Sequence, residues 1–357
     1  MDAGEIQSKI NAADDQILAL LNERTALIKR LGKCRKDESG DLLDPEYESR
    51  LLARLSALNK GPVRNETLRA VFREIISGAM VVDAPLIVAF LGPATTFTHQ
   101  AARTRFGGSA QYVPQPSITD VFEAVDHDQA NYGVVPVENS TEGAVTHTLD
   151  MFVDSNVKVC AEINMAIHHN LLSHCRTKEE IKVIYSHPQV FGQCRHWLQR
   201  HLPTIPLVEV SSTTEAASRC ANEPAAAALA SALAADRYNL DVLAQNTEDF
   251  SDNLTRFLVL SRQDGKPTGD DKTSMFFVLR DRVGALYESL RPFYAHKINL
   301  TFIESRPSRR KRWEYYFFVD FLGHVSEKRV QEVLAELGEH CQFVKIVGSY
   351  PRAASTA

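Results

Sequence analysis

The chain has 357 residues, 44% of them hydrophobic, which is enough to bury more than one core, so two or three domains are expected. Its formal net charge of −5 is spread along the sequence without a long basic run, which argues against nucleic-acid binding. No apolar run is long enough to span a membrane, and the start lacks the regions of a signal peptide. We therefore expect a cytoplasmic protein that acts on a small molecule and does not bind membranes.

The first domain has the pattern of three helices. Across residues 5–35, apolar residues recur about every 3.5 positions, which predicts one long helix with a continuous apolar seam. Asp44 and Pro45 form a cap and a first-turn proline for a second helix, which ends at Gly61-Pro62, where a third begins. Because three helices make only a thin core, we expect dimerisation through the long helix.

After Asp83 the pattern changes to short apolar runs that alternate with helical stretches. The predicted strands are 86–91, 132–137, 183–185 and 258–260. The predicted helices are 117–126, 189–201 and 223–236. This alternation indicates a mainly parallel sheet covered by helices, in a region long enough for two lobes with a cleft between them.

The C-terminal region has a different order of elements. After a polar linker at 263–270 come four strands and two helices in the order βαββαβ, which is typical of a ferredoxin-like module. The predicted strands and helices are 273–279, 284–295, 298–306, 313–321, 326–340 and 343–350.

Cysteine and histidine spacing predicts no metal site. The six cysteines show no CxxC pair or other metal-type spacing, so we interpret them as reduced thiols. His168, His169 and His174 lack further ligands in the sequence pattern, and we interpret them as structural.

Ordered motifs along the middle region resemble those of prephenate dehydratase. They include Ala89-Phe90-Leu91-Gly92-Pro93, Val137-Glu138-Asn139-Ser140-Thr141-Glu142-Gly143, Ser186-His187-Pro188-Gln189, Ser211-Ser212-Thr213 and Thr255-Arg256-Phe257. The tail resembles an ACT regulatory domain through Gly284-Ala285-Leu286, Asn299-Leu300-Thr301 and Glu304-Ser305-Arg306-Pro307. The helical front resembles the chorismate mutase domain of bifunctional chorismate mutase/prephenate dehydratases.

This resemblance implies three domains and their folds. Residues 1–82 are expected to form an all-α, chorismate-mutase-like domain of three helices. Residues 85–262 are expected to form a two-lobed α/β dehydratase domain similar to periplasmic binding proteins, and residues 272–351 an α+β ferredoxin-like ACT domain.

The resemblance also implies the conversion of prephenate to phenylpyruvate, CO2 and water, without a metal or a redox cofactor. Aromatisation drives the reaction, so the enzyme has to hold two carboxylates and help hydroxide to leave. The family assigns the latter task to Thr255, which as a poor acid is better pictured as a polarised hydrogen-bond donor. Strand alternation points Arg256 to the opposite face, which favours a structural ion pair over a carboxylate contact.

Other site residues follow from the same motifs. The implied catalytic partners of Thr255 are Glu138, Ser186 and Gln193. The implied substrate-binding residues are Asn139, Ser140, Thr141, Ser211, Ser212, Thr213, Arg256 and Phe257. Loops rich in Ser and Thr bind anions through hydroxyl and backbone donors, although turns and helix caps use the same residues. The family has Glu-Gly-Thr after Gly-Pro where this chain has Ala94-Thr95-Thr96, so the conformational freedom of that glycine is lost.

For the C-terminal module, the resemblance implies an L-phenylalanine site at the interface of two copies, hence a homodimer or homotetramer. Its implied residues are Gly284, Ala285, Leu286, Asn299, Leu300, Glu304 and Ser305. Feedback inhibition requires that phenylalanine bind preferentially to a less active conformation.

The helical domain departs from the mutase pattern. Arg24, Asp44 and Glu48 match it, and Arg35 stands where lysine is usual. Gln7 and Tyr47 replace two expected arginines, and Ala79 and Asp83 occupy late polar positions. We therefore hypothesise a weak or inactive mutase kept for dimerisation, while compensation by Arg50 or Lys9 stays open.

Two alternatives to the dehydratase remain at this point. Arogenate dehydratase acts on a substrate that carries an additional amino group, and the sequence does not discriminate it. A non-catalytic amino-acid sensor is the alternative from another class, because two-lobed α/β domains also occur as binding proteins.

Overall fold

The computed structural model describes residues 2–35, 45–82, 84–250, 252–308, 311 and 313–353, with the backbone alone at 32–35 and 45–49. The chain forms two compact units, Met1–Leu86 with Phe106–Gln111, and Ile87–Arg105 with Tyr112–Ala357. Within the residues described, no helix is both long and apolar enough to cross a bilayer.

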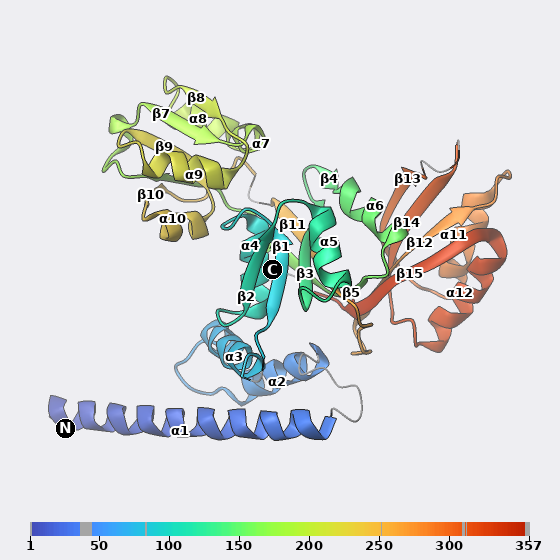
Figure 1. The fold of residues 1–357 in the computed structure, drawn as a ribbon, viewed down its shortest axis with the longest axis horizontal. Coiled ribbons are helices and arrows are strands. Elements are labelled where there is room, and N and C mark those ends of the chain that lie inside the picture. Colours follow the sequence, from blue (N-terminus) through green and yellow to red (C-terminus); the bar gives the residue numbers. More distant parts are fainter. Residues whose placement is uncertain are drawn as a thin grey trace. The chain divides into compact units, whose positions relative to one another are not determined.

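The first unit contains the three predicted helices. They are α1 (Ala3–Arg35), α2 (Pro45–Leu58) and α3 (Asn65–Met80). Figure 1 shows α1 as one uninterrupted helix. The apolar side chains of Ile6, Ile10 and Ile17 on α1 are about half exposed, so the residues that the structure describes leave this seam partly uncovered. Dimerisation through α1 stays a prediction, and the predicted cap Asp44 lies outside the described residues.

The first lobe of the second unit is a six-stranded sheet of order β2-β1-β3-β11-β5, with β4 paired to β3. Its strands are β1 (Ile87–Leu91), β2 (Gln111–Gln115), β3 (Tyr132–Asn139), β4 (Gly143–Ala144), β5 (Lys158–Ala166) and β11 (Leu254–Ser261). Its helices are α4 (Phe97–Phe106), α5 (Ile118–Asp126) and α6 (Thr146–Asp154).

The second lobe is a five-stranded sheet of order β10-β6-β9-β7-β8. Its strands are β6 (Asn170–Ser173), β7 (Val183–Ser186), β8 (Leu207–Glu209), β9 (Ala226–Ala230) and β10 (Asp241–Ala244). Its helices are α7 (Pro188–Gln193), α8 (Arg195–His201), α9 (Thr213–Ala221) and α10 (Ala232–Tyr238), with a short 3-10 turn at Lys178–Glu180. The predicted helix at 189–201 is therefore two helices that meet at Cys194.

The expectation of a mainly parallel sheet is wrong, because both sheets are mixed. Strands β1 and β3 are parallel, but β11 is antiparallel to β3 and to β5. The chain leaves the first lobe after β5, builds the second lobe, and returns as β11 between β3 and β5. Because β11 runs antiparallel to β3, the first residues of β11 lie beside the last residues of β3, and Thr255 is paired with Asn139.

The predicted helix at 223–236 is also wrong. Its alanine-rich start forms strand β9, whose side chains have no exposed area, and only the later part forms helix α10. Alanine favours helices, but β9 pairs with β6 and β7 on either side in the middle of the sheet. Hydrogen bonding and burial in the sheet therefore override the local propensity.

The C-terminal module has the predicted βαββαβ order. Its elements are β12 (Asp271–Leu279), α11 (Ala285–Ala295), β13 (Leu300–Pro307), β14 (Tyr315–Leu322), α12 (Lys328–His340) and β15 (Cys341–Pro351). The strand order is β13-β14-β12-β15, and Figure 1 shows α11 and α12 on one face of this sheet. Phe276 and Tyr350 of the module belong to the same hydrophobic core as Val159 and Leu258 of the first lobe, so the two are joined by a continuous core.

Gly348 on β15 permits this docking. A Cβ at this position would overlap the carbonyl oxygen of Val159 on β5 and lie 2.8 Å from its nitrogen. Both atoms belong to the backbone and cannot move aside, so only glycine allows the two strands to approach this closely.

We predict that Gly348→Ala lowers the free energy of unfolding by roughly 1 to 3 kcal/mol, the usual cost of overpacking. The matched control is Gly338→Ala in α12, where a Cβ meets nothing within 4 Å. This control is expected to stabilise the protein by about 0.5 to 1 kcal/mol, because alanine is the better helix former. Urea unfolding measures both changes, and equal stability of the two variants would contradict the prediction.

Candidate functional site

Thr255 and Asn139 form the centre of the candidate site. Thr255 is 9% exposed, and its Oγ1 accepts a hydrogen bond of 2.8 Å from Asn139 Nδ2. Asn139 Oδ1 in turn accepts from the backbone nitrogens of Thr141, at 2.9 Å, and Glu142, at 3.2 Å, which fixes the orientation of the amide. Within the described residues, the Thr255 hydroxyl donates to no protein acceptor, so its proton is left for a ligand.

Asn253 and Gln193 connect Thr255 to the second lobe through hydrogen bonds. Asn253, 4% exposed, accepts from Asn139 Nδ2 at 2.8 Å and donates to Gln193 Oε1 at 3.3 Å. Gln193, the last residue of α7, donates through Nε2 to Glu142 Oε1 at 3.2 Å. Gln193 was predicted from its motif, whereas Asn253 was missed, although it lies only two residues before Thr255 in a polar run.

The predicted serines of the second lobe make local contacts. Ser186 is fully buried, and its hydroxyl donates to the carbonyl of Leu229 at 2.8 Å. Ser212 caps α9 by accepting from the backbone nitrogen of Glu215 at 3.0 Å. Bonds from the hydroxyl and backbone of Ser211, with one from Arg219, lower the pKa of Glu215 to about 2. Ser211 and Ser212 contact the start of α9, whereas Ser186 contacts strand β9. The substrate roles of these three serines and of Thr213, the first residue of α9, stay predictions.

Ser140 and Phe257 also have partners inside the first lobe. The Ser140 hydroxyl donates to the carbonyl of Asp252 and accepts from the backbone nitrogen of Leu254, each at 3.0 Å. Phe257 is 2% exposed and pairs with Pro136 on β3, inside the sheet. Their substrate contacts stay predictions, and for Phe257 this burial favours a packing role.

The loop that departs from the family motif is strained. Thr95 has φ of 74°, in the left-handed region that a β-branched residue rarely adopts and that glycine adopts readily. Its N–H donates to His99 Nδ1 at 3.0 Å, its carbonyl accepts from Ser231 at 3.0 Å, and its hydroxyl lies 3.1 Å from that of Thr214. Burial, with the nearby Arg103 and Arg237, lowers the pKa of His99 to about 4, so Nδ1 stays free to accept.

Arg256 lies on the opposite face of β11, as strand alternation predicted. It is 8% exposed, and Nε contacts Glu162 at 2.7 Å, Nη1 contacts Asp320 at 2.6 Å and Nη2 donates to the hydroxyl of Tyr350 at 2.9 Å. The nearest oxygen of the predicted catalytic residue Glu138 lies 3.7 Å from Nη1. Because Asp320 and Tyr350 belong to the C-terminal module, Arg256 links that module to the strand of Thr255. This geometry favours the structural ion pair, and a substrate contact stays a prediction.

Glu162 balances two buried cations. Besides Arg256, it binds Lys272 Nζ at 2.8 Å, and it accepts from the backbone nitrogen of Ala353 at 3.0 Å. Burial alone raises the pKa of Glu162, but the charges of Arg256 and Lys272 outweigh burial, so the pKa lies below its ordinary value. The ionised form of Glu162 is therefore part of the folded state.

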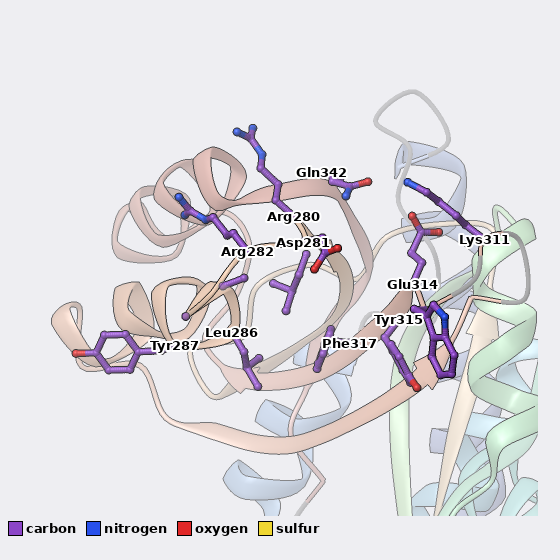
Figure 2. Close-up of a pocket in the computed structure, with 14 residues that line it drawn as sticks. Arg280, Asp281, Arg282, Leu286, Tyr287, Lys311, Glu314, Tyr315, Phe317 and Gln342 are labelled. Atoms are coloured by element: carbon purple, nitrogen blue, oxygen red, sulfur yellow. The ribbon is translucent and has the colours of Figure 1, made fainter.

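The C-terminal module contains a cavity of about 500 Å³ beside the start of α11 (Figure 2). Gly284, with φ of 78°, Ala285 and Leu286 line it together with Tyr315 and Phe317 of β14. The other predicted phenylalanine contacts lie elsewhere: Asn299 lines a second cavity of about 210 Å³, and Leu300, Glu304 and Ser305 lie along β13. One copy of the module therefore does not bring the predicted set together.

In the helical unit, Arg24 is the predicted mutase residue whose surroundings are described. Its Nη1 and Nη2 are buried and have no hydrogen-bond partner within the described residues. Gln7, where an arginine was expected, donates to Asn11 at 3.1 Å on the exposed surface of α1. The side chains of Arg35 and Glu48, and all of Asp44, lie outside the described residues. Across the described parts of both units, no three His, Cys, Asp or Glu side chains are grouped to hold a metal ion.

We predict that the Glu162 cluster makes stability depend on acid pH. A lowered pKa in the folded protein contributes stability that is present above the ordinary glutamate value of about 4.3 and is lost as the pH falls through the folded value. Glu162→Gln should lower the free energy of unfolding by roughly 3 to 5 kcal/mol at pH 7, because two buried cations lose a carboxylate partner. Between pH 5 and the folded pKa, the stability of the variant should fall less than that of the wild type. Urea unfolding at several pH values tests this, and parallel pH profiles would contradict it.

Family models and known relatives match the chain along almost its whole length. The models for chorismate mutase type II, prephenate dehydratase and the ACT domain match residues 6–82, 88–265 and 273–339. A bifunctional chorismate mutase/prephenate dehydratase of Aquifex aeolicus is 47% identical over 353 residues, which cover 98% of each chain.

Solved structures match about three quarters of the chain. The prephenate dehydratase of Arthrobacter aurescens in complex with L-Phe is 35% identical and covers 75% of this chain and 90% of that one, with a TM-score of 0.69. GqqA, a novel type of quorum-quenching acylase, is 26% identical and covers 75% of this chain and 98% of that one, also with a TM-score of 0.69. The fold therefore does not by itself name a reaction. The Aquifex relative and the three models in order do show that this chain belongs to the bifunctional chorismate mutase/prephenate dehydratase family.

Proposed function

We propose that the chain converts prephenate to phenylpyruvate, CO2 and water, and that the reaction takes place beside Thr255 and Asn139, where β11 begins and β3 ends. The observation that carries this proposal is the direction of the bond between them. Because Thr255 Oγ1 accepts from Asn139, the hydroxyl proton of Thr255 is available to the leaving oxygen of the substrate.

The reaction needs little more than that donor and a site that holds the two carboxylates. When the bond to the departing CO2 breaks, its electron pair enters the ring, and the C–O bond at the opposite ring carbon breaks with its pair on oxygen. The hydrogen bonds of Thr255 stabilise the charge that develops on this oxygen, which leaves as hydroxide and becomes water by taking a proton from solvent. Thr255 is too weak an acid to be consumed in the step.

Neutral donors are proposed to hold the carboxylates. The Gln193 amide has a second N–H beyond the bond to Glu142, and the first turn of α9 directs its free N–H groups outward at Thr213. The Thr141 hydroxyl donates to Asn253 Oδ1 at 3.3 Å, so a carboxylate has to replace that acceptor to take its proton. We place Ser211 and Ser212 around this core of the site, within the proposed dehydratase bounds 85–262. Glu138 is paired with Arg256 across β3 and β11 and therefore lies on the opposite face, and Ser186 is fully buried, so any part that these two residues take in the reaction is indirect.

We predict that Thr255→Val, which keeps the side-chain shape and removes the hydroxyl, lowers kcat for prephenate about 10² to 10³-fold, the usual cost of losing one transition-state donor. Thr255→Ser is the matched control and should keep most of the activity, because it restores the hydroxyl. Steady-state turnover of prephenate measures both. An active Thr255→Val enzyme would refute the assigned role of Thr255, and an inactive wild type would refute the proposed reaction and favour an amino-acid sensor.

The same assay with arogenate separates the remaining enzyme alternative. The proposal expects a higher kcat/KM for prephenate than for arogenate, and the reverse ratio would identify an arogenate dehydratase.

We further propose that L-phenylalanine binds the C-terminal module, bounded at 272–351, and inhibits the enzyme. The cavity at Gly284, Ala285 and Leu286 supports part of this site. A second copy would supply Leu300, Glu304 and Ser305 from β13 and Asn299 from the position just before that strand, which one copy leaves apart. An even-numbered assembly, a homodimer or homotetramer, follows from this arrangement. We also propose that the enzyme is cytoplasmic, the compartment expected for this biosynthetic step.

We predict that Gly284→Ala weakens phenylalanine binding by about tenfold, because a left-handed backbone costs a residue with a Cβ roughly 1 to 2 kcal/mol and the turn beside the cavity has to shift. Calorimetric titration of phenylalanine into wild type and variant measures the change. Equal affinities would place the site elsewhere.

A second activity is favoured by Arg24. A buried guanidinium without a protein partner is costly unless an anion binds it, and chorismate is a dianion. We propose that residues 1–82 bind chorismate through Arg24, with Arg35, Asp44 and Glu48, and that turnover is weak because Gln7 and Tyr47 replace two cations.

We expect chorismate turnover to lie about two to four powers of ten below that of a mutase with both arginines, if each lost contact costs roughly 1.5 to 3 kcal/mol. Arg24→Leu should remove the remaining turnover without changing prephenate turnover. Chorismate turnover unchanged in Arg24→Leu would contradict the site, and robust turnover in wild type would contradict the expected weakness.

A further inference from the structure

We propose that His169 is a positioning residue for the dehydratase reaction, and that its Nε2–H holds the Gln193 amide so that the second N–H of that amide faces the substrate. The inference rests on the proposed function, because Gln193 is one of its site residues. It assigns a role to a histidine that the sequence pattern had indicated only as structural.

The backbone of His169 is held firmly where the chain passes from the first lobe to the second. The residue lies between β5 and β6, and its carbonyl accepts from the backbone nitrogen of Thr247 at 2.8 Å and from the Thr247 hydroxyl at 2.9 Å. Its N–H donates to Glu248 Oε2 at 2.9 Å. Thr247 and Glu248 belong to the segment by which the chain returns to the first lobe, so both crossings are bonded to each other at His169.

The side chain of His169 is 1% exposed and makes one polar contact within the described residues. Its Nε2 lies 2.8 Å from Gln193 Oε1, and the edge of the ring packs against Phe97 with centroids 5.3 Å apart. The other ring nitrogen, Nδ1, is buried and has no hydrogen-bond partner in the part of the chain that the structure describes.

The hydrogen-bond network determines which nitrogen carries the proton. Glu142 is an acceptor, so Gln193 must turn its NH2 toward Glu142 and its oxygen toward His169. His169 Nε2 must therefore be the donor, and Nδ1 carries the lone pair. Burial lowers the pKa of His169 more strongly than the bond to Gln193 and the charge of Glu248 raise it, which is consistent with a neutral ring.

A packing role alone does not account for an imidazole here. A buried polar atom without a partner costs about 1 to 3 kcal/mol, and an aromatic hydrocarbon would fill the same space without that cost. The Nε2–H is the polar function that the ring supplies. Without it, the orientation of the Gln193 amide would depend on two longer bonds, from Asn253 to Oε1 at 3.3 Å and from Nε2 to Glu142 at 3.2 Å. One hydrogen of Gln193 Nε2 is used by Glu142 and the other has no acceptor within the described residues, so fixing the amide directs this donor outward.

The test is a double-mutant cycle in the full-length chain, with kcat and KM for prephenate as readouts. His169→Phe keeps the ring and removes the donor, and we expect kcat to fall about 10 to 100-fold, the scale of a misplaced site group. His169→Gln, which carries an N–H at a similar distance from the backbone, should recover most of this loss. In a Gln193→Ala background, His169→Phe should have no further effect, because the residue that it positions is absent. His168→Gln is the matched control and should keep full kcat, because His168 lies on the same crossing and its ring bonds Glu248 rather than Gln193.

Four results separate the possibilities. An equal fall in kcat in both backgrounds, or no recovery with His169→Gln, would show that His169 serves packing only and would overturn the inference. Full activity of His169→Phe would overturn it as well. A wild type without prephenate turnover would instead refute the proposed function. Should His169→Phe fail to fold, ¹⁵N NMR of the wild-type imidazole decides: an Nε2-protonated ring supports the inference, and an Nδ1-protonated ring contradicts it.

Discussion

A single buried cation sets the geometry on which the candidate site depends. Arg256 is held by Glu162 of the first lobe and by Asp320 and Tyr350 of the C-terminal module. Because a guanidinium buried this deeply has to keep its partners, the position and rotation of β11 at this residue are fixed. The preceding residue, Thr255, is thereby fixed on the other face. The two faces of β11 thus have different roles: one anchors the C-terminal module and the other carries the Thr255 hydroxyl of the candidate site.

On the Thr255 face, the candidate site consists mainly of neutral side chains that form a continuous hydrogen-bond network. Thr255, Asn139, Asn253, Gln193 and His169 are linked by consecutive hydrogen bonds of 2.8 to 3.3 Å. Each amide in the network has its orientation determined by its neighbours, so the free donors at Thr255 and Gln193 are fixed in direction before a ligand arrives. Such preorganised dipoles stabilise developing charge without reorganising during the reaction. This hydrogen-bond network extends from the first lobe to the second, so any movement between the lobes changes the distance between these two donors.

Local patterns in the sequence predicted much of the fold. Periodicity indicated the three helices of the first unit and the βαββαβ order of the module, and strand alternation placed Arg256 opposite Thr255. The failures have a common physical cause, which is tertiary pairing. The alanines of β9 favour a helix locally and become a strand only because β6 and β7 flank them. The insertion of β11 between β3 and β5, which makes the sheet mixed, leaves no trace in hydrophobic periodicity. The motifs marked Thr255 and Gln193 as site residues. The contacts of Arg256 with Asp320 and of His169 with Gln193 join elements that are distant in the sequence, so no local pattern predicts them.

The most direct test of the account is a crystal structure of the Thr255→Val enzyme with prephenate bound. The account predicts that the substrate lies on the Thr255 face of β11, with its ring hydroxyl against residue 255, a carboxylate within hydrogen-bond distance of Gln193 Nε2, and the contacts of Arg256 with Glu162 and Asp320 unchanged. A substrate bound on the other face, with a carboxylate paired to Arg256 in place of Asp320, would contradict it.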